Sequence, residues 1–229
     1  MTRSLALATC LAALCLAALL GGCAANVQLA QKPVLYVDEW VRRPDPSIIV
    51  RPENSPISPL SAVIVPLRVA QSMDMRHEVG RGVTRVIWQT WLADKVFPGL
   101  AFDEQNHWTG PDAALKRHAR SGADLVIGGT ITNIMFGGTA GETTISLTLE
   151  IYDARTGALL WSMAHAGMMA NAQTMDYILL DRVSRLPDDP LHAIVTVLAH
   201  ELGEPVRLWN QPPPPEPDED AGPAPKPLG

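Results

Sequence analysis

The chain has 229 residues and a formal net charge of −6 at pH 7, from 18 Lys and Arg against 24 Asp and Glu. This mildly acidic balance provides no electrostatic footprint for nucleic acid and no basic face for anionic lipid. All three cysteines, Cys10, Cys15 and Cys23, lie near the amino terminus, so the sequence beyond them excludes disulfides, a cysteine nucleophile and a cysteine-ligated metal site.

The amino-terminal segment has the pattern of a secretory signal. Arg3 provides a positive start, Leu5–Leu20 is an almost unbroken apolar run, and small residues lead to Cys23. The run is shorter than the ~20 residues of a membrane-spanning helix. The tetrapeptide Leu20–Cys23 resembles the bacterial lipobox, which implies cleavage after Gly22 and a lipid on the Cys23 sulfur. An ordinary signal peptide with a chance cysteine is the alternative.

After the predicted signal peptide, residues 1–22, the chain divides into three segments of different composition. Residues 23–57 are predicted to begin with the lipidated cysteine and to form a tether. Their widely spaced prolines disfavour helix, and one short strand is predicted at Val34–Val37. Residues 58–209 are predicted to form one globular domain. Residues 210–229, rich in Pro and acidic side chains, are predicted to be a disordered tail.

The first half of the domain alternates strands with helices. Ser61–Val69 is a β-branched apolar run and predicts a strand, with a bulge or an edge position where Pro66 removes a donor. Met75–Lys95 carries an apolar stripe at helical spacing and predicts a helix. A short strand at Leu100–Phe102 follows. A helix over Thr109–Ser121, capped by the threonine hydroxyl, comes next.

The middle of the domain predicts a β-meander. Ala123–Phe136 is expected to be a strand, and strict apolar–polar alternation over 145–152 predicts the clearest strand of the chain. Asp153–Gly157 has the residues of a tight turn, and Ala158–Ala166 is predicted to return as the paired strand. These segments therefore predict adjacent antiparallel strands.

The end of the domain is expected to be helical. Met175–Leu186 is predicted as one helix and Pro190–Leu202 as a second, which Gly203 ends. The resulting order is strand, helix, strand, helix, strand, strand, strand, helix. This order predicts an α/β fold: a single two-layer domain with helices packed on a mixed β-sheet.

The sequence contains no recognisable catalytic constellation. The six histidines lack the i, i+4 spacing of a zinc clamp, and no Gly-x-Ser-x-Gly or phosphate-loop motif occurs. Carboxylate pairs such as Asp188 and Asp189 lie beside loops, and a glycosidase needs two carboxylates that face each other. We therefore expect a protein that is not an enzyme and that binds no cofactor and no metal.

Aromatic and methionine side chains are the remaining candidates for function. Trp88 and Trp91 flank the helical apolar stripe, so they are candidate partner contacts. Met168 and Met169 belong to a methionine-rich stretch that would suit an adaptable apolar surface. For all four residues, packing in the core is the alternative.

A longer pattern resembles domains with the TolB amino-terminal-like fold. It comprises the strand Gly122–Ile131 and, after a loop, the hairpin Leu147–Ser162 with its Asp-x-x-Thr-Gly turn and Leu-Trp-Ser strand. The opening strand Val63–Leu67 fits the same pattern. Such domains occur in the curli-secretion channel lipoprotein, in PelC-type polysaccharide-export lipoproteins and in LpoB-type activators of penicillin-binding proteins. The likeness covers roughly residues 60–203 and involves fold residues, so it implies no active site.

The resemblance implies a non-enzymatic component of the bacterial envelope. Ala24 follows the cysteine where inner-membrane lipoproteins carry Asp, which implies an outer-membrane lipoprotein on the periplasmic face. We expect an assembly or scaffold subunit of an export or secretion apparatus, with other envelope proteins and a homo-oligomer as partners and no nucleic acid. A regulatory activator of a peptidoglycan synthase is one alternative, and an envelope enzyme of unknown chemistry is another.

Overall fold

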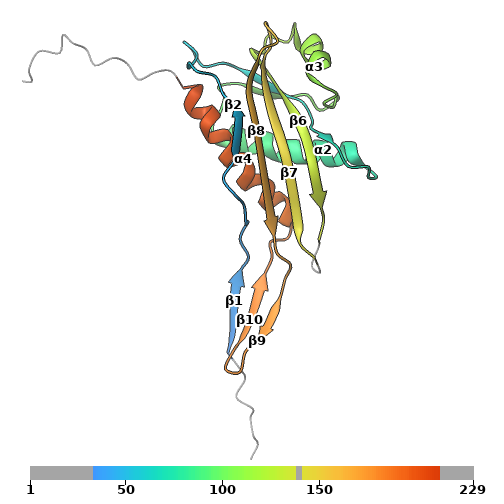
Figure 1. The fold of residues 1–229 in the computed structure, drawn as a ribbon, viewed down its shortest axis with the longest axis vertical. Helices are drawn as coiled ribbons and strands as arrows, with labels where there is room; N and C mark the ends of the chain where they lie inside the picture. Colours follow the sequence, from blue (N-terminus) through green and yellow to red (C-terminus); the bar gives the residue numbers. More distant parts are fainter. Residues whose placement is uncertain (1–32, 138–140, 212–229) are drawn as a thin grey trace, which may run out of the picture.

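The computed structural model describes residues 33–137 and 141–211, and the predicted signal, Cys23 and most of the predicted tail lie outside them. The body is built on a seven-stranded mixed sheet with the order β2-β8-β7-β6-β3-β5, in which β4 also pairs with β6 (Figure 1). Its strands are β2 (Ser47–Val50), β3 (Ala62–Ile64), β4 (Arg68–Val69), β5 (Leu100–Phe102), β6 (Leu125–Met135), β7 (Thr143–Asp153) and β8 (Leu159–Met169). The β6–β7–β8–β2 part is antiparallel, and β3 lies parallel to both β5 and β6. The mixed sheet confirms the predicted α/β class.

Two long helices cover one face of this sheet. These are α2 (Arg76–Ala93) and α4 (Pro190–Trp209), which pack on each other and on the sheet. The alternation in β7 points Ile145, Leu147, Leu149 and Ile151 into the core beneath the helices, where each is at most 1% exposed. Burial of this apolar face is the main stabilisation of the fold.

The short helix α3 (Pro111–His118) lies on the opposite face, near one end of the sheet (Figure 1). Beneath it, Trp108 packs with Val63, Val126 and Tyr152 in a second, smaller apolar cluster. Gly128 allows this arrangement, because a Cβ there would overlap the Trp108 ring. No helix of residues 33–137 and 141–211 covers the rest of this sheet face.

A second sheet extends beyond the end of the main one (Figure 1). We call it the arm, and it comprises β1 (Val34–Asp38), β9 (Thr174–Asp176) and β10 (Asp181–Arg185) in the order β1-β10-β9. The central strand β10 pairs in parallel with β1 and antiparallel with β9. An isolated bridge between Arg42 and Met168 follows where the chain returns to the body.

The structure contradicts two predictions for the segments that form β1, β2, β9 and β10. The helix predicted over Met175–Leu186 is wrong, because these residues form a hairpin whose second strand pairs with β1. The short strand predicted at Val34–Val37 is confirmed as β1, but the rest of the described part of 23–57 is not only a tether, since β2 belongs to the main sheet. Both strands occupy proline-free intervals between the prolines, where no backbone donor is missing.

The helix ends also differ from prediction. The last helix does not end at Gly203 but continues to Trp209, because Gly203 provides room where α4 crosses Trp91 of α2. The residue that caps α3 is Gly110, with no side-chain cap, so the predicted capping by Thr109 is wrong. At α4, Asp189 Oδ1 accepts a hydrogen bond from the backbone N–H of His192.

The turn of the β7–β8 hairpin is confirmed. Asp153 Oδ1 accepts hydrogen bonds from the backbone N–H groups of Arg155 and Thr156, and Gly157 has φ 75°. Trp161 in β8 is buried and packs edge-on against Trp209 at a ring distance of 6.0 Å. Among the helices of the described residues, none combines the length and apolar character needed to span a membrane.

Candidate functional site

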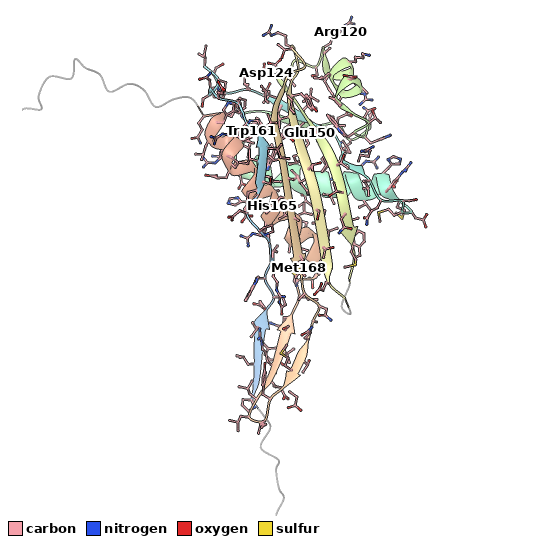
Figure 2. The ribbon with its side chains drawn as sticks, in the orientation of Figure 1. Arg120, Asp124, Glu150, Trp161, His165 and Met168 are labelled. Atoms are coloured by element: carbon pink, nitrogen blue, oxygen red, sulfur yellow. The ribbon has the colours of Figure 1, made fainter. Side chains whose placement is uncertain are left out.

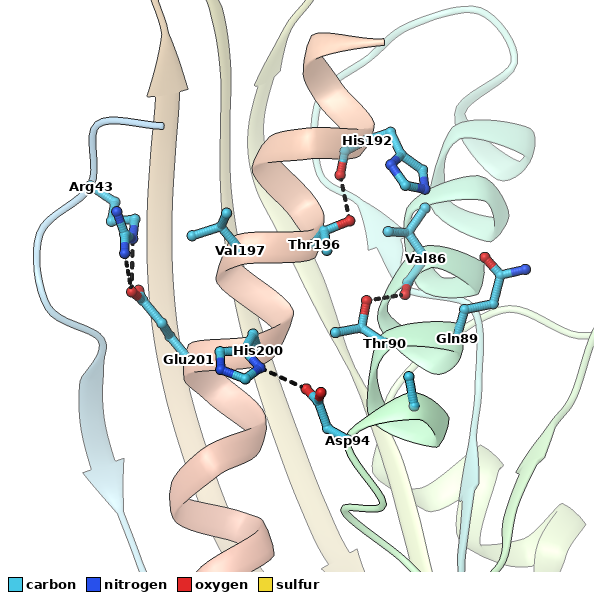
Figure 3. A pocket seen from close by; sticks show the side chains of 11 residues that line it. Arg43, Val86, Gln89, Thr90, Asp94, His192, Thr196, Val197, His200 and Glu201 are labelled. Carbon is cyan, nitrogen blue, oxygen red and sulfur yellow. Dashed lines mark hydrogen bonds and ion pairs between the residues drawn. The ribbon is translucent and has the colours of Figure 1, made fainter. Parts of the chain in front are cut away.

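A groove of about 590 Å³ lies between the two long helices on the outer side of the helix layer (Figure 3). Side chains of α2, α4 and the loop before β2 line it: Arg43, Val86, Gln89, Thr90, Ala93, Asp94, His192, Thr196, Val197, His200 and Glu201. At its rim His200 Nδ1 lies 2.8 Å from the Asp94 carboxylate. The groove is open, and its floor is made of the apolar and hydroxyl side chains between the helices.

An ion network at the edge of this groove joins three segments. Glu201 on α4 accepts a hydrogen bond of 2.8 Å from Arg43 Nε, and its other oxygen lies 2.7 Å from Nε2 of the buried His165 on β8. The hydrogen bond from Arg43, supported by that with His165, holds the pKa of the Glu201 carboxyl below its usual value against the effect of desolvation. The network therefore ties the loop before β2 to the helix and to the sheet.

This network is better suited to structure than to catalysis. The His165 ring is buried in the protein, so it has no path to a substrate in the groove. Glu201 is engaged by both of its partners, and the pair lacks a nucleophile. Within residues 33–137 and 141–211, no group of three or more His, Cys, Asp or Glu residues is arranged to hold a metal ion.

A larger surface is the sheet face that α3 leaves uncovered. We call it the open face, and it consists of the outward-facing residues of β7 and β8, which stand opposite each other in the strand register: Thr144, Ser146, Thr148, Glu150, Ser162, Ala164, Ala166 and Met168. Figure 2 shows Glu150 and Met168 near its two ends. Glu150 is the only ionisable residue among the eight, and the other side chains except Met168 are short. A partner could therefore approach the backbone of this face closely.

The arm provides a second exposed surface, which is apolar. At its tip Ile178 and Leu179 are 93% and 81% exposed, and Leu35 and Tyr36 on β1 are more than half exposed. Arg185 forms an ion pair with Asp38 and lies 5.6 Å from the Tyr36 ring, so these contacts hold the β1–β10 pairing at its end nearer the body. No residue of the β9–β10 hairpin from 174 to 183 belongs to the apolar core clusters of the described chain.

The predicted contact residues divide between surface and core. Trp91 is fully buried, with Nε1 donating to the Ala199 carbonyl at 2.7 Å, and Met169 is 2% exposed, so the prediction of a surface contact is wrong for these two. Trp88 is half-buried, stacks on Phe102 and donates to the Leu100 carbonyl. Met168 lies on the open face (Figure 2). Cys23 lies outside the described residues.

The sequence reasoning missed the apolar tip of the arm. The run Tyr177–Leu180 was expected inside a helix, where such residues would face a core. The available signal was its position between Asp176 and Asp181, which bracket four uncharged residues in the manner of a hairpin loop. The outward residues of β7 were predictable from its alternation, but the absence of a covering helix was not.

Comparisons with known proteins found no matching family model and no matching curated protein. Among solved structures, a PelC dodecamer from Paraburkholderia phytofirmans is 16% identical, with 74% of this chain and 97% of that chain covered and a TM-score of 0.47. The LpoB C-terminal domain from Salmonella enterica is 14% identical over 50% and 87% of the two chains, with a TM-score of 0.27. Lipoprotein GNA1162 from Neisseria meningitidis is 19% identical over 47% and 79%, with a TM-score of 0.25. PelC and LpoB, which the motif in β6–β8 resembles, are thus both among the structural neighbours.

Proposed function

We propose that this chain is a lipoprotein of the bacterial envelope, anchored in the outer membrane through a lipid on Cys23, with its folded domain in the periplasm. The lipobox tetrapeptide Leu20–Cys23 supports the anchor, and Ala24 supports the outer membrane. The domain acts as a non-enzymatic assembly subunit of an export or secretion apparatus by contact with other copies and other envelope proteins.

The open face carries the assembly role. Seven of its eight side chains are uncharged, and six of these are Ser, Thr or Ala, so a flat partner surface would meet few desolvated charges there. In the groove between α2 and α4 the hydroxyls of Thr90 and Thr196 donate to backbone carbonyls of their own helices, so neither hydroxyl is shown bonded to a base, which supports contact over catalysis. In a two-fold dimer this face would meet the same face of a second copy, whereas in a ring it would meet a different patch of the next copy.

The anchor is tested by the mass of the protein purified from its native membranes. We expect an amino terminus at Cys23 with acyl chains attached, and loss of that mass in Cys23→Ser. Sucrose-gradient separation of the two membranes should place the native protein with the outer membrane. An unmodified amino terminus would remove the proposed anchor.

The assembly role is tested by light scattering on the mature chain carrying Cys23→Ser. We expect a discrete oligomer, which Ala164→Arg on the open face should dissociate because the long charged side chain would be buried between copies. The matched control is Ala93→Arg, at an exposed position of α2 on the helix-covered side of the sheet. A monomer at every concentration would contradict self-assembly and would favour the activator alternative.

A further inference from the structure

The tip of the arm has the wrong residues for a hairpin turn in water. The backbone N–H of Tyr177 donates to the Leu180 carbonyl at 2.9 Å, which closes a turn with Ile178 and Leu179 at its centre. These central positions usually hold Gly, Asn or Asp, which adopt turn conformations readily and are solvated. Here they hold two aliphatic side chains that are 93% and 81% exposed.

The arm also lacks a covering layer. A three-stranded sheet is stable on its own only with a packed apolar face. Among the described residues no helix makes an extensive contact with the arm, and the large apolar side chains of its strands are mostly exposed: Val34, Leu35, Tyr36 and Met175. The free energy of the arm would therefore fall if its apolar side chains left water.

The position of Pro33, just before β1, indicates which surface lies near the tip. The carbonyl of Pro33 accepts a hydrogen bond from the backbone N–H of Asp181, so the start of β1 lies beside the residue that follows the tip. Nine residues lie between Cys23 and Pro33, and the ten residue steps from one to the other span at most about 36 Å when fully extended. A lipid on Cys23 would hold the tip close to a bilayer surface.

We propose that the turn Tyr177–Leu180 is a second membrane contact, which inserts into the lipid surface beside the acyl chains of Cys23. Ile178 and Leu179 enter the boundary between headgroups and acyl chains, and Tyr177 lies at the headgroup level, where aromatic rings with a polar tip are favoured. This inference relies on the lipid on Cys23, which is part of the proposed function. Asp176 and Asp181 flank the turn, so apolar insertion rather than attraction to anionic headgroups drives the contact.

The first test separates the tip from the lipid anchor. The mature chain with Cys23→Ser is floated with vesicles of phosphatidylethanolamine and phosphatidylcholine. We expect binding that the double substitution Ile178→Ser and Leu179→Ser weakens on the order of a hundred-fold, because two aliphatic side chains no longer leave water. The matched control is Ile57→Ser, since Ile57 is 97% exposed on the body and should contribute nothing. Raising the salt concentration should not weaken binding.

The second test locates the tip in the lipidated protein. Leu179→Cys provides the single free thiol of the lipidated chain for an environment-sensitive fluorophore, and Arg120→Cys at the far end of the molecule is the control (Figure 2). In reconstituted vesicles, spin-labelled lipids should quench the label at residue 179 and leave the label at residue 120 unquenched.

Each outcome decides the inference. Equal vesicle binding by the double variant and by Ile57→Ser, no vesicle binding at all, or an unquenched label at residue 179 would overturn it. So would a change in light-scattering mass with unchanged vesicle binding, because the tip would then contact a second copy. A missing acyl mass on Cys23 would remove the proposed anchor and leave the flotation result intact, so the two failures are distinguishable.

Discussion

The contact between α2 and α4 can be tested by replacing Gly203 with Ala and Trp91 with Ala, singly and together. Trp91 is fully buried, and its Nε1 donates to the Ala199 carbonyl at 2.7 Å. A Cβ on Gly203 would lie 2.7 Å from Nε1 and 3.0 Å from Cδ1 of that indole, closer than ordinary packing allows. The two substitutions therefore act on the same few atoms.

The expected magnitudes follow from these contacts. Gly203→Ala gains about 1 kcal/mol of helix propensity but loses about 2–3 kcal/mol to overpacking against an indole that is held in place, so the net loss is about 1–2 kcal/mol. Trp91→Ala loses a buried hydrogen bond and leaves a large cavity, about 4–5 kcal/mol together. In the double variant the indole that would clash is gone, so the added methyl group fills part of the cavity. The double variant should lose only about 3–4 kcal/mol, against about 5–7 kcal/mol for additive effects.

Urea unfolding of the mature chain with Cys23→Ser, followed by far-ultraviolet circular dichroism, measures the four free energies of the cycle. Circular dichroism is preferable because Trp91→Ala itself changes the tryptophan fluorescence. Additivity of the two substitutions within about 0.5 kcal/mol would refute the close approach of Gly203 to the indole.

Two further predictions concern the ion network and the sheet. Glu201→Gln should lower stability by about 1 kcal/mol at pH 7, because its hydrogen bonds to Arg43 and His165 are strongest with a carboxylate. The pKa of Glu201 is below its ordinary value of 4.5 in the folded state, so its stabilisation is complete above pH 4.5 and is lost as pH falls below it. The variant's deficit in urea midpoint should shrink at pH 3, and a deficit that is the same at both pH values would contradict this. Gly129→Ala should cost about 3 kcal/mol or more, because Gly129 has φ 151° and a Cβ there would lie 2.0 Å from a carbonyl oxygen of β7. Gly82→Ala, with open space around its Cβ position, should instead gain up to about 1 kcal/mol, and similar urea midpoints for the two variants would contradict this explanation.

Local signals were enough to predict the centre of the fold. The alternation over 145–152 and the Asp153–Gly157 turn together specify the β7–β8 hairpin, since both act between neighbours in sequence. The stripe of α2 contains Val83, Ile87 and Trp91 at i, i+4 and i+8. That spacing alone indicates that Trp91 belongs to the core. In the broader apolar stripe of the sequence Trp91 lies at the flank, and this position made it a candidate contact.

The arm and the end of α4 could not be predicted in the same way. Strand β10 owes its conformation to β1, and no property of Asp181–Arg185 alone indicates that partner. Gly203 would end many helices, but here a tertiary contact with Trp91 overrides its propensity. The open face depends on the absence of a third layer, which only the arrangement of the helices decides.

The parallel pairing of β1 with β10 also has a consequence for the order of folding. Asp38 and Arg185 are 147 residues apart, whereas the strands of the β6–β7–β8 meander are joined by short connections. Closing a long loop delays a contact relative to local ones. Because the chain is synthesised from its amino terminus, β1 must wait for nearly the whole domain to follow. The segment nearest Cys23 is therefore the first to arrive and the last to find its partner.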